Sequence, residues 1–167
     1  YVPLVGATVL GTDALIVTLQ LTETQRATAV VGSATLGGDG SALLLDAFAG
    51  AVIDIGENRN TDQTNLALVE IADDVHPSVV LAASSIALST GILTIEASES
   101  VDHSSVIVSG ITIRDVVSGG AVISLVGAVP IIPSGRSPIF EIQLTELQRV
   151  SVIEISNTKG GDGSNSI

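Results

Sequence analysis

The side chains of this chain whose type and spacing could do chemistry are mostly oxygen donors in one acidic segment and just beyond it. Ca²⁺ in proteins takes roughly six to eight oxygen ligands from carboxylates, carbonyls and Asn side chains. The candidate ligands are Asp54, Glu57, Asn58, Asp62, Asp73 and Asp74. Their spacing does not match an EF-hand loop, and Arg59 lies in the middle of the segment. The alternative is a solvated acidic loop whose Asp and Asn side chains bond to nearby backbone.

The sequence signals for a catalytic site are weaker than the signal for a calcium site in this acidic segment. Asp102-His103-Ser104-Ser105 places an acid, a base and hydroxyls side by side, but the members of a catalytic triad come from separate elements. The segment Gly37-Gly38-Asp39-Gly40 lacks the Lys of a phosphate-binding P-loop. Because it occurs twice, we predict a tight turn whose glycines have positive φ. Nothing selects a pair of carboxylates for glycoside hydrolysis. We therefore expect no enzyme and no bound cofactor other than calcium.

Covalent sugars are the remaining candidate chemistry. No Asn-x-Ser/Thr sequon is present, so N-linked glycans are not expected. The Pro/Ser-rich segment 130–138 is the most exposed-looking loop, and Ser134 and Ser137 in it are candidates for O-linked glycans. The alternative is the same loop without sugars.

Composition excludes several partners. Six basic against eighteen acidic residues give a formal charge of −12, which argues against nucleic acid and against an anionic membrane surface. The longest apolar stretch, 120–133, is too short to span a bilayer. Hydrophobic residues make up 46% but aromatic residues 2%, which predicts a β-branched and aliphatic core with Phe48 and Phe140 as its large rings. Without cysteine, the fold must depend on packing alone.

An internal repeat organises the chain. Residues 19–41 and 142–164 are identical at 13 of 23 positions at an offset of 123, and Leu4-Val5-Gly6-Ala7 recurs at 125–128 at an offset of 121. A period of this length is the size of a whole domain. We therefore expect residues 1–75 to be the later part of a first unit and residues 76–167 the early part of a second, in a window of a longer repeat chain or a processed product.

Short strands between turn signals are expected in both units. The apolar runs that predict them are 14–21, 65–71, 79–88, 92–96, 111–114, 122–125 and 139–144. The runs 79–88 and 92–96 should form a hairpin, and those at 111–114 and 122–125 should flank a turn. Thr22 and Thr145, each followed three residues later by Gln, match a helix capping box. Each unit thus reads as an all-β, Ig-like β-sandwich, incomplete in this chain, with one short helix.

The order STGILTIEASESVD, ISLVGA, LTELQR, GGDGS and LLLDAFAGAVIDIGEN resembles the tandem Ig-like repeats of very large bacterial, algal or protist surface proteins. Residues 50–58 are similar to the GAxxDxxGN closing motif of those repeats, with Glu57 inserted before Asn58. The resemblance implies an extracellular or cell-surface location and a spacer, adhesive or fibre-forming role.

An incomplete sandwich exposes an open edge and an uncovered core, which a strand from a neighbour can fill. We therefore predict a structural filament of this chain with itself, assembled head to tail by strand complementation. The candidate assembly residues lie in the two terminal strands: Val2, Leu4, Val5, Val9, Ile139, Phe140, Ile142 and Leu144. The alternative function is an adhesin stalk module that binds calcium or glycan.

Overall fold

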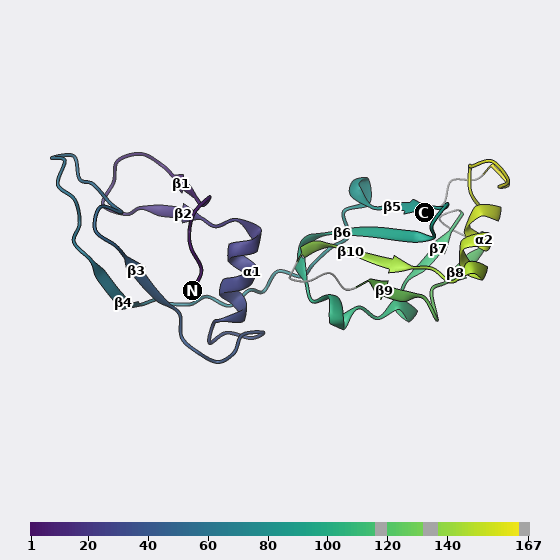
Figure 1. Ribbon diagram of the computed structural model, residues 1–167, viewed down its shortest axis with the longest axis horizontal. Coiled ribbons are helices and arrows are strands. Elements are labelled where there is room, and N and C mark those ends of the chain that lie inside the picture. The colour runs from purple at the N-terminus through teal and green to yellow at the C-terminus, as the bar shows by residue number, and fades with distance from the viewer. Residues whose placement is uncertain (116–119, 132–136, 164–167) are drawn as a thin grey trace. The chain divides into compact units, whose positions relative to one another are not determined.

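The computed structural model describes residues 1–115, 120–131 and 137–163 (Figure 1). The chain divides into two compact units, Tyr1–His76 and Pro77–Ile167, called unit 1 and unit 2 below. This boundary falls one residue beyond the junction expected from the sequence. Each unit is described by itself.

Unit 1 consists of two small antiparallel ribbons and one helix (Figure 1). Strand β1 (Thr8–Leu10) pairs with β2 (Thr18–Gln20), and β3 (Leu44–Ala47) pairs with β4 (Gln63–Ala67). Helix α1 (Glu23–Val31) follows β2 directly.

Unit 2 contains a four-stranded antiparallel sheet, a two-stranded ribbon and a helix (Figure 1). The sheet has the order β5-β6-β10-β9, formed by Ser85–Ala87, Ile92–Val101, Ser137–Gln143 and Val129–Ile131. The ribbon pairs β7 (Thr112–Arg114) with β8 (Val122–Ser124), and helix α2 (Glu146–Glu154) follows β10. The described residues of this unit also include three short 3₁₀ helices: η1 (Leu81–Ala83), η2 (His103–Ser105) and η3 (Val108–Gly110).

The mostly β class and one α-helix per unit are confirmed, but several strands are shorter than the apolar runs that predicted them. The hairpin before residue 97 is confirmed as β5–β6, and the pair flanking residue 120 as β7–β8; residues 118 and 119 of the expected turn lie outside the described residues. The run 14–21 forms a strand only over Thr18–Gln20, because β1 offers partners only to those residues.

The two helices begin as the capping boxes predict. The Thr22 hydroxyl accepts a hydrogen bond from the Gln25 N–H, and the Gln25 side chain accepts one from the Thr22 N–H; Thr145 and Gln148 repeat this pair of bonds. Two of the N–H groups that a helix leaves unpaired at its start are thereby satisfied. Over the part of the chain that the structure describes, neither helix has the length and apolarity to cross a bilayer.

The buried hydrophobic core lies in unit 2. It joins β6, β7, β10 and α2 through Ile95, Ile113, Leu125, Ala128, Ile142, Leu144, Val152 and Ile155, with Phe140 packed against it. In unit 1, every residue of which is described, Ala27 is the one buried hydrophobic residue. The prediction that Phe48 belongs to a core is wrong: its side chain is 53% exposed, because unit 1 has no apolar layer to cover it. No closed sandwich is seen among the described residues of either unit.

The sequence repeat is reproduced in three dimensions. The β1–β2–α1 segment of unit 1 and the β9–β10–α2 segment of unit 2 share their strand register, since Thr8↔Gln20 corresponds to Val129↔Gln143. The Gln25 side-chain amide donates to the Pro3 and Val5 carbonyls at 2.8 and 3.0 Å. The Gln148 amide makes the equivalent bonds to Ser124 and Val126 at 2.9 and 3.0 Å. A single local structure therefore occurs twice, and its two surroundings can be compared directly.

Candidate assembly surface

The acidic segment forms a hairpin tip held by its own side chains. The Asp54 carboxylate accepts hydrogen bonds from the backbone N–H and the side-chain amide of Asn58, at 2.8 and 3.0 Å. The Asn58 side chain, and then its backbone N–H, lower the pKa of Asp54. Glu57 has a φ of 64°, in the left-handed region, at the turn itself. Asp62 accepts from the Ala49 N–H at 2.6 Å. The carboxylate oxygens of Asp54 and Asp62 therefore accept hydrogen bonds from backbone and side-chain amides of the loop itself.

The predicted calcium ligands are not brought together into one cluster. No group of three or more acidic or His side chains suited to a metal ion occurs among the described residues. Asp73 contacts Arg26, a cation, rather than other carboxylates. Asp74 is exposed. Calcium binding at this segment stays a prediction without structural support.

The remaining candidate residues lie in unit 2. Asp102 is the N-cap of η2 and accepts hydrogen bonds from the N–H and hydroxyl of Ser104. His103 is buried, with its Nε2 3.1 Å from the Ser137 carbonyl oxygen. Ser137 is the half-buried first residue of β10, so the prediction that it lies in an exposed loop is wrong: pairing with β6 draws it into the sheet. Ser134 lies outside the described residues, and O-glycosylation stays a prediction.

The two predicted assembly strands differ in their surroundings. β10, which carries Ile139, Phe140 and Ile142, lies between β6 and β9 and is paired on both sides. Ile142 and Leu144 belong to the core of unit 2. At the other end of the chain, Val9 lies in β1, whereas Val2, Leu4 and Val5 precede that strand. Over Glu141–Gln143, β10 is therefore paired on both sides and offers no free edge there.

Unit 1 exposes the apolar side chains whose counterparts form the core of unit 2. Ile142 is 0% exposed, whereas Leu19, at the same place in β2, is 43% exposed. Leu125 is 0% exposed, whereas its counterpart Leu4 is 36% exposed. In unit 2 the cover comes from Ile95 of β6 and Ile113 of β7. No segment of residues 1–76 takes the place of β6, because β2 pairs with β1 alone. The unpaired edge of β2, together with the exposed side chains of Leu19 and Leu4, is called the open face below.

Three donors fix the β5–β6 turn at the corner between β10 and α2 in unit 2. The Gln143 amide donates to the Thr90 carbonyl at 2.9 Å, and the Leu144 N–H donates to Gly91 at 2.8 Å. The Arg149 Nη1 donates to the Leu88 carbonyl at 2.9 Å. The guanidinium itself is held by two bonds to Glu146, at 2.7 and 2.6 Å.

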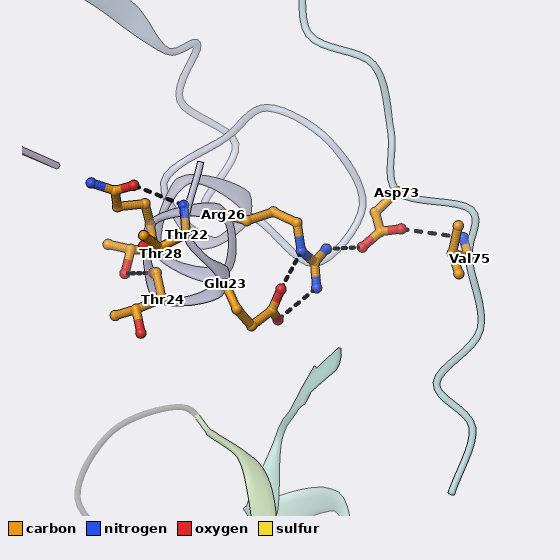
Figure 2. Close-up of polar contacts among 8 residues, drawn as sticks. Thr22, Glu23, Thr24, Arg26, Thr28, Asp73 and Val75 are labelled. Carbon is orange, nitrogen blue, oxygen red and sulfur yellow. Dashed lines mark hydrogen bonds and ion pairs between the residues drawn. The ribbon is translucent and has the colours of Figure 1, made fainter. Parts of the chain in front are cut away.

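Unit 1 repeats the three donors without the turn. Gln20, Leu21 and Arg26 stand where unit 2 has Gln143, Leu144 and Arg149. Figure 2 shows that Arg26 also makes two bonds to the glutamate three residues before it, Glu23, both at 2.9 Å. Its Nη1, however, donates to the Asp73 carboxylate, at the place where Arg149 meets a backbone carbonyl (Figure 2). Asp73 in turn accepts from the Val75 N–H at 3.2 Å.

Charge and hydrogen bonding stabilise this arrangement of ions. The Glu23 carboxylate raises the pKa of Arg26, which keeps the guanidinium charged at any ordinary pH. The Val75 N–H, and then the Arg26 guanidinium, lower the pKa of Asp73. Because Asp73 lies at the surface, water screens the pair, and its contribution to stability is small. Such a contact can be exchanged for another at low cost.

We expect the Arg26–Asp73 contact to be lost in acid. A carboxyl group with a lowered folded pKa stabilises the folded chain above its ordinary value, here 3.8; this stabilisation disappears as the pH falls through the folded pKa. An NMR titration of the Asp73 carboxyl carbon should give a pKa below 3.8 in the native chain. In Arg26→Ala the value should move part of the way back, because the Val75 N–H remains. An unchanged Asp73 pKa in this variant would contradict the contact.

The donor set was missed in the sequence, although a signal for it was present. The motifs LQLTETQR and IQLTELQR were interpreted through their capping boxes, which need only the Thr and the second Gln. The first Gln and the Arg are identical in both copies without any role in the cap. Their identity could have pointed to a shared contact outside the helix. Asp73 could not have been found in this way, because the identity between the two copies covers residues 19–41 and does not reach residue 73.

The sequence matches no protein-family model, and neither a curated protein nor a solved structure is significantly similar to it.

Proposed function

We propose that this chain is a structural segment of an extracellular filament, built from Ig-like repeats that assemble head to tail by β-strand complementation. The observation that carries the proposal is the contrast between Leu19 and Ile142, which hold the same place in two copies of one structure. Leu19 is 43% exposed, whereas Ile142 is fully buried. A duplicated segment is expected to keep its apolar side chains when, in the assembled protein, those side chains are buried in both copies.

The energetics favour assembly. Covering apolar surface contributes about 25 cal/mol per Å², and a strand added to a sheet edge also satisfies backbone groups along that edge. Large apolar side chains are exposed in many parts of unit 1, and those in the stretch that includes β2 are Leu15, Ile16, Val17 and Leu19. A face of this kind is a site of self-association unless something covers it.

The net charge of −12 is consistent with a repeat that must stay dissolved while it presents such a face. A complete repeat in this proposal is a closed Ig-like sandwich with one short helix. Its partners are further copies of itself, and O-linked glycans at Ser134 would decorate it.

Electron microscopy of the purified full chain over a range of concentrations tests the proposal. The expected result is regular filaments whose number increases with concentration and does not change when a chelator is added. A chain that stays monomeric at every concentration would contradict a filament. Assembly that requires calcium would instead favour the adhesin-stalk alternative, in which the acidic segment around Asp54 binds the ion.

A further inference from the structure

The free edge of β2 has a defined occupant at the equivalent place in unit 2. There, β6 pairs antiparallel with β10, so that Ile95 lies opposite Phe140 and Leu93 opposite Ile142. The same edge of β2, on the side away from β1, has no partner strand in unit 1. Unit 2 therefore shows which kind of strand this edge accepts and in which register.

We propose that the free edge of β2, together with Gln20, Leu21 and Arg26, is the acceptor site for a hairpin of the β5–β6 type supplied by another copy of the same repeat. This inference rests on the proposed function and gives the filament contact its residues. Transferred from unit 2, the register places Val17 opposite an Ile95-type residue and Leu19 opposite a Leu93-type residue.

The apolar part of the site follows from the alternation of side chains along a strand. Ile142 of β10 and Leu144, just after β10, belong to the core of unit 2 together with Ile95. Leu19 of β2 and Leu21, just after β2, take these positions in unit 1. A hairpin bound in the same register would bury them with its own Leu93-type and Ile95-type side chains, as the core of unit 2 does.

The polar part of the site fixes the turn of the incoming hairpin. Gln143, Leu144 and Arg149 bind three backbone carbonyls of the β5–β6 turn in unit 2, those of Thr90, Gly91 and Leu88 respectively. Gln20, Leu21 and Arg26 supply the same donors in unit 1. Arg26 must exchange Asp73 for a carbonyl oxygen of the hairpin, and the surface position of Asp73 makes this exchange inexpensive.

A groove in unit 1 lies beside these donors. Its volume is about 210 Å³, and Leu21, Arg26 and Ala29 line it together with residues 68–71. In unit 2 the counterparts of Leu21 and Ala29 are Leu144 and Val152, both buried, and Leu88 of the turn packs against that cluster. The groove therefore gives a Leu88-type side chain of the incoming turn a place to bind.

The turn also imposes a sequence requirement on the donor. Gly91 has a φ of +72°, and a Cβ there would lie 3.1 Å from the Gln143 Nε2 and 3.2 Å from the Arg149 Cδ. The positive φ and the close approach of the turn backbone to the Gln and Arg side chains thus favour glycine. A hairpin with another residue at this position would have a strained φ and would require the two side chains to shift.

A synthetic peptide of residues 85–101 added to the full chain tests the proposal. Hydrogen–deuterium exchange with mass spectrometry should show slower amide exchange over residues 16–21 when the peptide is present. The peptide with Ile95→Asp should bind about 30-fold more weakly or worse, because a buried apolar anchor is replaced by a charge. The chain variant Leu19→Lys should lose the protection. Leu36→Lys is the matched control, since Leu36 is 92% exposed and its counterpart in unit 2 is already Lys159.

The outcomes separate this inference from the proposed function. Protection that Leu19→Lys abolishes and Leu36→Lys retains supports the acceptor site. No protection, or equal binding of the Ile95→Asp peptide, overturns it even if filaments form by another contact. Binding of the peptide by a chain that never forms filaments would support the site and overturn the filament. Because the peptide variant leaves the chain unchanged, misfolding of Leu19→Lys cannot account for the result.

Discussion

Replacing Ile142 with Ala should destabilise unit 2 by about 3 kcal/mol, within the range of roughly 2–5 kcal/mol for truncating a buried Ile or Leu. Ile142 is 0% exposed and contacts the centre of the core, so its removal leaves a cavity that the surrounding side chains fill only in part. The same truncation at the equivalent position of β2, Leu19→Ala, should cost about 1 kcal/mol or less, because its side chain is half in water.

Hydrogen exchange measured along a urea series separates the two units, since each can open on its own. The amides of β6 and β10 should lose protection at lower urea in Ile142→Ala, while those of unit 1 stay unchanged. Leu19→Ala serves as the control, because the two residues share one place in a duplicated structure. Equal losses in the two variants would contradict the difference in burial on which the assembly proposal rests.

The same two variants can be compared under conditions in which the chain assembles. Once a strand covers the open face, Leu19 should become a core residue and its truncation should cost as much as that of Ile142. The remaining difference in destabilisation between Leu19→Ala and Ile142→Ala then measures how fully the open face of unit 1 is covered.

The local elements of this fold could be predicted from the sequence because their causes are local. The capping boxes at Thr22 and Thr145 depend on residues three positions apart, and the β5–β6 hairpin joins neighbouring apolar runs. The repeat itself was visible as identity between residues 19–41 and 142–164. Such short-range patterns can be recognised without knowing which segment packs against the strand or helix.

Burial could not be predicted in the same way, because it depends on what covers a face. Leu19 and Ile142 have similar side chains in nearly identical local sequences, yet one is exposed and the other is not. The difference comes from β6, which begins 45 residues before β10 in sequence (92 against 137) and has no counterpart among residues 1–76. Phe48 was assigned to a core for the same reason, from its type rather than from its surroundings.

The two glycine-rich turns show a further limit. Positive φ was predicted for these glycines, and it occurs at Gly37, Gly40, Gly160 and Gly163. Gly38 and Gly161 need glycine for another reason, namely the space beside them. A Cβ at Gly38 would lie 2.1 Å from the Ser33 carbonyl oxygen. A sequence shows that a glycine recurs, but not which of the two requirements keeps it there.

Replacing Gly161 with Ala should therefore be among the most damaging single changes in unit 2, at about 3 kcal/mol. The added Cβ would lie 1.9 Å from the Ser156 carbonyl oxygen and 2.6 Å from that of Ile153. Both atoms are backbone at the end of α2, so neither can turn aside as a side chain would. The turn must move, and it loses the bond from the Gly163 N–H to the Ser156 carbonyl, at 3.3 Å.

Gly163→Ala is the matched control, because it changes the same turn by the same methyl group. Gly163 has a φ of +89°, and no atom of the described residues lies within 4 Å of its Cβ position, so the substitution should cost only the left-handed conformation, about 1–2 kcal/mol. Urea unfolding of the two variants, followed by exchange of the α2 amides, should give the larger loss for Gly161→Ala. A larger loss for Gly163→Ala would mean that conformation, rather than the close approach to Ser156, is what this turn requires of its glycines.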